Sequence, residues 1–257
     1  MYLSEYKHII LFDTETTGLN FNNDRIIEIA YQEAVPTGYN SFKTVRTSDV
    51  FIRHPHMTID DKFIDRVDAN GNRLTIAQLT HITDKMLLDY GIDESVVAKD
   101  VYETFFRPDT LIMAYNLNFD LNMIKSLLSR HGYDVDLTSV DYLDLYTLYK
   151  DYNFYSWKKD ETSRRLGHRL DAAVDKFDVD VKNTHRAIDD VLATWEVFKV
   201  FLEKKYKILP YMNVFGFNPK YQDELVKVEG ITYFPQVKPK DVLYASLKEY
   251  KRKMNNK

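Results

Sequence analysis

The sequence predicts an α/β fold in which helices flank a mixed sheet. Three segments with strand-like patterns follow one another near the start of the chain, and helical segments then alternate with short apolar strands. A run of strands followed by this alternation is typical of a layered α/β domain. The 257 residues are enough for one such domain with a sizeable core.

The three opening strands are predicted from apolar runs and turn residues. A continuously apolar run at 9–12 ends at Asp13 and indicates a buried strand. The segment 26–34 alternates and is rich in β-branched residues, and a turn at 36–39 leads to another strand at 45–52. We therefore expect these strands to form an antiparallel meander.

The rest of the domain is predicted to alternate helices with strands. Apolar residues have helical spacing over 75–106, and an apolar strand follows at 111–114. The next helix ends near Gly132, and a short strand lies near Val140. Three further helices are expected at 143–152, 166–177 and 187–204.

Composition narrows the function classes. The net charge of -4 gives no overall attraction to nucleic acid, although an enzyme that gathers carboxylates around metal ions can be acidic as a whole. The absence of cysteine excludes disulfides, thiolate zinc sites and cysteine nucleophiles. The first residues have no signal-peptide pattern, and no apolar run approaches the ~20 residues of a membrane span. We expect a soluble, cytoplasmic protein without membrane contact.

A change in charge divides the chain into two predicted parts. Residues 236–257 contain seven Lys or Arg and two acids, a net charge of +5, which leaves -9 for residues 1–235. We expect a main domain over 1–205 and an appended C-terminal element over 206–257. Glycines and prolines predict that this element is turn-rich at first and then forms a short basic helix.

The strongest chemical signal is the sequence Phe-Asp-Thr-Glu-Thr-Thr-Gly at 12–18. Alternate residues of a strand point the same way, so Asp13 and Glu15 present two carboxylates on one side. Two such carboxylates repel each other when buried, and a bound cation is a common remedy. The alternative is an ordinary pair of solvated acids.

A second segment, Ala-Tyr-Asn-Leu-Asn-Phe-Asp at 114–120, repeats the order of buried strand, polar residue and helix start. Asp120 is therefore a candidate third carboxylate at the same edge of the sheet. Alternatively, Asn116 or Asn118 caps the helix, and Asp120 favours the positive end of the helix dipole.

A third segment, Thr-His-Arg-Ala-Ile-Asp-Asp at 184–190, precedes an amphipathic helix. Adjacent helical residues differ by about 100°, so Asp189 and Asp190 cannot face one site equally well. The apolar stripe of the helix, if anything, disfavours Asp190, and spacing alone leaves the choice open. A histidine in the position of His185 is usually structural or exposed.

In this order and at these separations, the three motifs resemble those of the DEDDh 3′–5′ exonuclease family. Its members include the proofreading epsilon subunit of bacterial DNA polymerase III, ribonuclease T and oligoribonuclease. The resemblance covers roughly residues 7–203. It implies a ribonuclease H-like fold, with a mixed five-stranded sheet flanked by helices, and an exonuclease domain over 1–205.

The resemblance also assigns roles to single residues. It makes His185 the catalytic base, chooses Asp190 over Asp189, and gives four metal ligands, Asp13, Glu15, Asp120 and Asp190. Hard oxygen ligands of this kind select Mg²⁺ or Mn²⁺, and two ions are implied. Two ions about 3.5–4 Å apart stabilise both the attacking hydroxide and the leaving 3′ oxygen.

Within that scheme Asp13 bridges the ions, Glu15 and Asp190 lie toward the nucleophile ion, and Asp120 lies toward the leaving-group ion. His185, with a reference pKa of about 6.5, takes the proton from the attacking water near neutral pH.

Four residues are candidates for substrate binding: Thr16, Leu19, Asn116 and Phe119. Leu19 and Phe119 are suited to stack or wedge against the terminal bases, and the alternative is that they are core residues beside the site. The chain departs from the family pattern twice. It has Thr80-His81-Ile82 where many relatives have His-Gly-Ile, and Tyr115 where some have histidine.

These observations predict an enzyme that releases nucleoside 5′-monophosphates from the 3′ end of single-stranded DNA, in proofreading or DNA degradation. A DNA polymerase is a candidate partner. One alternative is a 3′–5′ exoribonuclease acting on short RNA, because discrimination of the sugar rests on one or two contacts to the 2′ position. Another is a catalytically inactive subunit that binds nucleic acid or docks on a polymerase. Retention of all five motif residues disfavours the inactive subunit.

Overall fold

The computed structural model describes most of the first 213 residues, namely 3–38, 40–67, 70–135, 137, 139–159, 167–181, 185–208 and 211–213. The predicted turn-rich segment, apart from residue 213, and the predicted basic helix lie outside the described residues.

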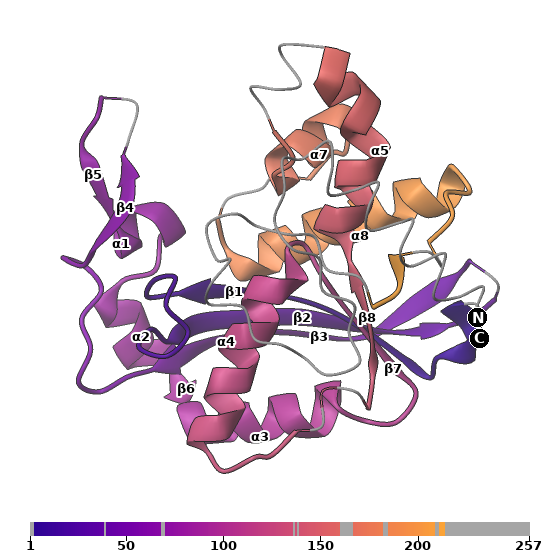
Figure 1. Cartoon of the computed structure of the whole chain (residues 1–257). Helices are drawn as coiled ribbons and strands as arrows, with labels where there is room; N and C mark the ends of the chain where they lie inside the picture. The colour runs from indigo at the N-terminus through magenta and orange to yellow at the C-terminus, as the bar shows by residue number, and fades with distance from the viewer. Residues whose placement is uncertain are drawn as a thin grey trace.

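A six-stranded mixed sheet forms the centre of the described domain (Figure 1). In spatial order its strands are β6 (Ile92–Asp93), β3 (Phe42–Arg53), β2 (Ile26–Pro36), β1 (His8–Thr16), β7 (Thr110–Ala114) and β8 (Asp141–Asp144). The first three strands of the chain form the expected antiparallel meander. β7 and β8 extend it with parallel pairing beside β1, and β6 pairs in parallel with β3. The mixed sheet is as predicted, with the two-residue β6 as a sixth strand.

Helices cover both faces of this sheet (Figure 1). One face packs against α5 (Leu145–Lys159), α7 (Leu170–Phe177) and α8 (Ala187–Glu203). The other face packs against α3 (Glu94–Phe105) and α4 (Leu117–Arg130). The alternation of β1 serves both layers, because Ile9 and Leu11 join the α8 side while Ile10 and Phe12 join the α4 side.

The helical spacing between residues 75 and 106 is divided among three helices. α1 (Ile76–Thr80) and α2 (Asp84–Tyr90) precede α3. Each of the three begins at a capping residue whose side chain accepts a hydrogen bond from a backbone N–H two or three residues later, Thr75, Thr83 and Asp93 respectively. These caps interrupt what the apolar pattern alone presents as a continuous helical region.

An antiparallel hairpin, β4 (Phe63–Val67) and β5 (Arg73–Thr75), stands apart from the sheet near the carboxyl end of β1 (Figure 1). The sequence pattern does not predict this hairpin. β4 reads Phe-Ile-Asp-Arg-Val, which places apolar residues on both faces and polar residues on both faces, so the strand lacks the alternation that reveals a half-buried strand.

The chain returns to the sheet after α8. Tyr211 and Met212 are buried, and Met212 pairs with Leu143 of β8 in an isolated antiparallel bridge. Residues 211–213 therefore pack against β8 of the sheet. Within the described residues, no helix is long and apolar enough to cross a membrane.

Candidate active site

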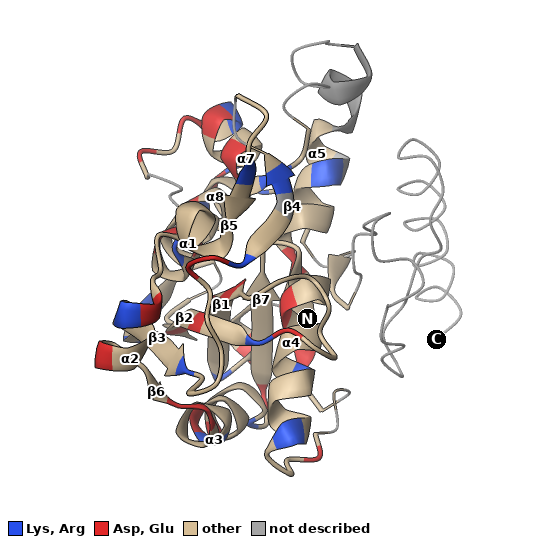
Figure 2. Ribbon diagram, turned by 90° about the vertical axis from the view of Figure 1, so that its left-hand side faces the viewer, with Lys and Arg blue, Asp and Glu red and all other residues tan. Residues whose placement is uncertain are grey.

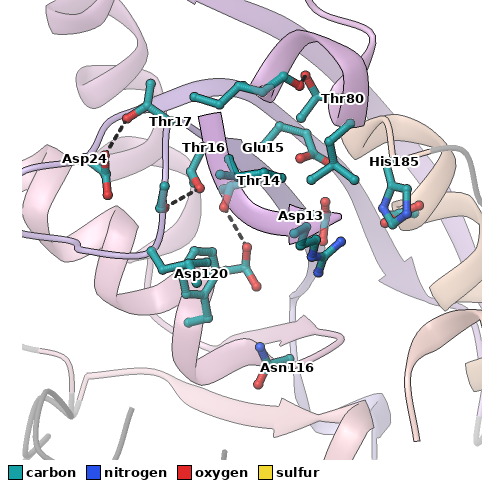
Figure 3. Close-up of a pocket in the computed structure, with 18 of the residues that line it drawn as sticks. Asp13, Thr14, Glu15, Thr16, Thr17, Asp24, Thr80, Asn116, Asp120 and His185 are labelled. Carbon is teal, nitrogen blue, oxygen red and sulfur yellow. Dashed lines mark hydrogen bonds between the residues drawn. The ribbon is translucent and has the colours of Figure 1, made fainter. Parts of the chain in front are cut away.

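A pocket of about 850 Å³ opens at the carboxyl end of β1 (Figure 3). The end of β1 and the loop after it form its floor, and the starts of α4, α7 and α8 form further walls. β4 with the adjacent Lys62, α1 and Tyr146 of α5 also contribute to the lining. All nine residues that the sequence analysis assigned to the site line this pocket: Asp13, Glu15, Thr16, Leu19, Asn116, Phe119, Asp120, His185 and Asp190.

The first motif is held in place by the loop that follows β1. The Thr17 hydroxyl donates to Oδ1 of Asp24 (3.0 Å) and accepts from the Arg25 backbone N–H (2.9 Å). Gly18 is required beside this contact, because a Cβ there would collide with the Asp24 carboxylate. The loop therefore fixes the position at which β1 ends and its carboxylates begin.

The third motif begins α8, and a buried carboxylate holds the start of that helix. Glu28 of β2 is 0% exposed and accepts from Arg186 Nε and from the Ala187 backbone N–H, both at 2.9 Å. Asp190 is the fourth residue of α8 and faces the pocket, whereas Asp189 does not line it. The geometry thus places Asp190 at the site, as the resemblance implies.

Three carboxylates meet at the pocket floor. One oxygen from each of Asp13, Glu15 and Asp190 lies within 4.8 Å of the other two. Burial, together with the charges of the neighbouring acids, raises the pKa of Asp13 and of Glu15 well above their usual values. Burial and the adjacent Asp189 raise the pKa of Asp190 to about 7. The site therefore concentrates acidic groups whose mutual repulsion the described residues only partly offset, through the charge of Arg66 near Glu15.

Asp120 lies on the other side of Asp13 and is not part of this three-acid cluster. Its Oδ1 accepts from the Thr14 hydroxyl at 2.6 Å (Figure 3). Thr14 points to the α4 side of β1, opposite to Asp13 and Glu15. Burial raises the pKa of Asp120 to about 7, although the Thr14 hydrogen bond lowers it. The hydrogen bond engages one oxygen of Asp120 and aims the carboxyl group toward the end of β1.

A second buried carboxylate, Asp144 at the end of β8, positions the helix that carries Asp120. Its Oδ1 accepts from the backbone N–H groups of Asn116 (3.0 Å) and Leu117 (3.3 Å) at the start of α4. Asn116 has a left-handed backbone (φ 69°), which asparagine tolerates well, and its side chain makes no capping hydrogen bond. Of the two alternatives for capping this helix, a side-chain cap by Asn116 is therefore not observed.

His185 lines the pocket next to the acids (Figure 3) and has a left-handed backbone (φ 56°) just before α8. Burial lowers the pKa of His185, and the positive charge of Arg66 lowers it further. The imidazole is therefore neutral near pH 7 and can accept a proton.

The four substrate-binding candidates differ in exposure. Leu19 is 41% exposed at the pocket rim, whereas Phe119 also packs against the core on the α4 side. The Thr16 hydroxyl donates to the Gly18 carbonyl (2.7 Å), so it supports the loop as well as lining the pocket. Asn116 presents its side chain to the pocket from the turn before α4.

The two departures from the family pattern have structural consequences. His81 ends α1 with a left-handed backbone (φ 59°), at the position where many relatives have glycine. The hydroxyl of Tyr115 donates to the His168 carbonyl at 2.6 Å, which ties the end of β7 to the segment before α7. Both residues adjoin the site without belonging to the acid cluster.

Sequence reasoning missed four residues that shape the site. Glu28 and Asp144 support the helices, while Arg66 and Arg169 line the pocket. Glu28 carried a signal, because an acid in the largely buried strand β2 needs a partner. Arg66 carried none, since it lies on the unpredicted hairpin.

The acid cluster fits a hard divalent cation. Oδ1 of Asp190 is buried and accepts no hydrogen bond from any described residue, so a strong acceptor is left without a donor. Carboxylate oxygens are the ligands that Mg²⁺ and Mn²⁺ prefer, and a cation would relieve the repulsion that raises these pKa values.

Comparison with known proteins agrees with this chemistry. The family model described as the RNase T exonuclease matches residues 10–198. The DNA polymerase III PolC-type of Caldanaerobacter subterraneus subsp. tengcongensis is 32% identical over 200 residues, and that of Staphylococcus aureus is 30% identical over 218 residues. These matches cover 77% and 84% of this chain but 12% and 13% of the relatives, so the chain spans about an eighth of their length.

Solved structures share the fold. A complex of E. coli ExoI with single-stranded DNA superimposes with a TM-score of 0.61 at 19% identity, covering 80% of this chain and 42% of that one. Exonuclease I from Methylocaldum szegediense gives a TM-score of 0.60 at 19% identity, with coverage of 79% and 42%. The motifs, the mixed sheet with its carboxylate pocket and the matched family model agree, and the chain belongs to the RNase T family of DEDD-type exonucleases.

Proposed function

We propose that the protein is a metal-dependent 3′–5′ exonuclease that hydrolyses the terminal phosphodiester bond of single-stranded DNA and releases nucleoside 5′-monophosphates. The observation that carries this proposal is the cluster of Asp13, Glu15 and Asp190 beside His185 on the floor of one pocket. With Asp120 next to Asp13, the four acids are suited to hold two Mg²⁺ or Mn²⁺ ions.

Bound cations would supply charge for the attacking water and for the leaving 3′ oxygen. The chain itself supplies the proton acceptor, because the lowered pKa of His185 keeps its ring neutral and ready to take the proton of that water. Leu19 and Phe119, which both line the pocket, offer apolar contacts to the terminal nucleotide. These contacts favour no particular base, in keeping with an enzyme that degrades any sequence.

DNA is the favoured substrate because the relatives are DNA polymerases and the similar solved structures include a complex with single-stranded DNA. The PolC-type relatives also support association with a DNA polymerase, since this chain corresponds to a small part of those proteins. An exoribonuclease remains the second candidate, with the same acids and histidine in the same roles.

One experiment tests the proposal and separates the two substrates. Matched 5′-labelled DNA and RNA oligonucleotides, single-stranded and with a mispaired 3′ end, are digested with Mg²⁺. We expect a ladder that shortens from the 3′ end of DNA and stops when EDTA is added. Shortening of RNA alone would replace DNA by RNA as the substrate. Binding without any digestion would favour the inactive subunit.

A further inference from the structure

The β4–β5 hairpin contributes an unexpected share of the pocket lining. Lys62, Phe63, Ile64 and Arg66 all line the pocket, although the hairpin stands apart from the sheet. Figure 2 looks onto the hairpin from the side that faces left in Figure 1, with the blue of Lys and Arg on β4. The three sequence motifs assign no role to these residues.

The base of the hairpin is anchored to the domain at two points. Ile64 packs against a small core cluster that includes Ile59 and Ile76. Lys62 Nζ pairs with Oδ1 of Asp24 at 2.8 Å, and Asp24 also accepts from the Asn20 backbone N–H (2.9 Å). The hairpin and the loop that carries Leu19 therefore form one continuous wall of the pocket.

Arg66 projects from this wall toward the catalytic residues. It is an exposed residue of β4 and lines the pocket together with Phe63 and Ile64. Its charge lowers the pKa of both Glu15 and His185, which places the guanidinium near them.

Arg66 makes no hydrogen bond or ion pair with any described residue. Other arginines of the domain are engaged with carboxylates, among them Arg46 with Asp100, Arg107 with Glu33, Arg130 with Glu94 and Arg186 with Glu28. A guanidinium that lines an acidic pocket and has no partner among the described residues is suited to a phosphate, for which arginine provides several donors in a planar fork.

Phe63 adds an aromatic surface to the same wall. Its side chain is 55% exposed although phenylalanine is usually buried, and Arg73 stacks over one side of the ring at 5.5 Å. A positive group beside an exposed aromatic ring is the arrangement by which proteins hold single strands, since the cation binds the backbone and the ring packs on a base or sugar.

We propose that β4 is a binding arm for single-stranded nucleic acid, in which Arg66 binds a backbone phosphate near the 3′ end and Phe63 packs on the adjacent nucleotide. The inference rests on the proposed function for the location of the 3′ end in the pocket. Arg66 would also offset, for an incoming phosphate, the repulsion from the four acids of the floor.

Binding without turnover tests this arm. The affinity of the full chain for a 5′-fluorescein-labelled oligothymidylate of twelve nucleotides is measured by anisotropy in Ca²⁺ over a range of salt concentrations. We expect Arg66→Ala to weaken binding roughly tenfold and to flatten the salt dependence by about 0.7 in slope, the contribution of one phosphate on a single strand. Phe63→Ala should weaken binding about five- to tenfold, with an unchanged slope, because stacking releases no counterions.

Arg46→Ala is the matched control, because it removes the same charge from an exposed strand position that does not line the pocket. It should bind as the unmodified chain does. If Arg66→Ala matches Arg46→Ala in both affinity and slope, the arm does not bind nucleic acid. A different result would contradict the proposed function instead. In that case the unmodified chain would bind the oligonucleotide, Arg66→Ala would weaken the binding, and the unmodified chain would still leave the oligonucleotide undigested with Mg²⁺.

Discussion

Glu28 accepts hydrogen bonds from the Arg186 side chain and from the Ala187 backbone N–H, so a carboxylate of β2 fixes the start of the helix that delivers Asp190. Glu28 is not itself in the acid cluster. The contact places negative charge at the N-terminus of α8, where the helix dipole favours it.

Asp144 holds α4 in the same manner, through the N–H groups of Asn116 and Leu117. The metal-ligand candidate of each helix is its fourth residue, Asp120 in α4 and Asp190 in α8. Two of the four acids are thus positioned by two other, buried acids.

The Glu28→Gln variant is expected to bind Mn²⁺ about 10–100-fold more weakly, the usual effect of losing a group that orients a ligand. The amide cannot satisfy both Arg186 and Ala187 as a carboxylate does, so the start of α8 should shift. Titration calorimetry measures the affinity. Glu33→Gln is the control, since Glu33 is a buried acid of the same strand, paired with Arg107 at 2.8 Å and outside the pocket. Equal losses in both variants would mean that Glu28 supports stability alone.

The Asp13→Asn variant should be inactive yet more stable than the unmodified chain in EDTA. The raised pKa of Asp13 means that the folded state binds more protons than the unfolded state above the usual carboxyl pKa of about 4. Stability without metal therefore falls as pH rises above about 4, and removing one charge should lessen that fall.

Thermal unfolding in EDTA at pH 5.5 and 7.5 measures this effect, and we expect Asp13→Asn to raise the Tm at pH 7.5 by a few degrees. Mg²⁺ should raise the Tm of the unmodified chain and not that of the variant. Asp89→Asn, on exposed α2, serves as the control and should leave the Mg²⁺ response intact. An Asp13→Asn variant that still gains stability from Mg²⁺ would contradict the assignment of Asp13 as a ligand.

The register of the third motif gives a paired prediction. Asp190→Asn should abolish nearly all digestion, because Asp190 contributes to the carboxylate cluster. Asp189→Asn, one residue away, should keep most of the activity and should lower the pKa of Asp190 by removing a neighbouring charge. Digestion of a labelled oligonucleotide with Mg²⁺ measures both variants, and the reverse order of activities would show that the helix presents Asp189 instead.

His185→Ala should reduce kcat about 10²–10⁴-fold, the usual contribution of a general base, with Mn²⁺ affinity nearly unchanged. Because burial and Arg66 lower the pKa of His185, the acidic limb of the pH–rate profile should lie below pH 6.5. Activity is lost as pH falls through that pKa, since the ring then carries its proton already. The control is His56→Ala, an exposed histidine outside the pocket lining. If the loss of activity at low pH persists in His185→Ala, that loss is due to protonation of the carboxylates and not of His185.

The sequence predicts those parts of the fold in which apolar residues form a continuous run or recur at a regular spacing. The apolar run before Asp13 and the alternation of 26–34 predict the opening strands, and the apolar strand before Asn116 predicts β7. The hairpin was not predictable, because β4 mixes polar and apolar residues on both faces. Its conformation depends on a few apolar contacts, such as the packing of Ile64 in the cluster that contains Ile59. No regular spacing of apolar residues in the sequence indicates these contacts.

The candidate site followed from the motifs only with the help of the family resemblance. Spacing alone did not decide whether Asp189 or Asp190 faces the site, and the apolar stripe of the helix disfavoured Asp190. In the structure it is Asp190 that lines the pocket. The helix start sets the rotation of α8, and that start depends on Glu28, which is 159 residues away in the chain. Contacts of this range are invisible to local periodicity.

Asn213 closes the edge of the sheet with its backbone and its side chain together. Its N–H donates to the Tyr142 carbonyl, and its side-chain oxygen accepts from the Tyr142 N–H, both at 2.8 Å, while its amide nitrogen donates to Asp141. Without this residue, β8 would present unpaired backbone groups that recruit strands from other molecules. A polypeptide cut at 205, the predicted end of the main domain, would be prone to self-association, whereas one that retains residue 213 would keep this edge of the sheet protected.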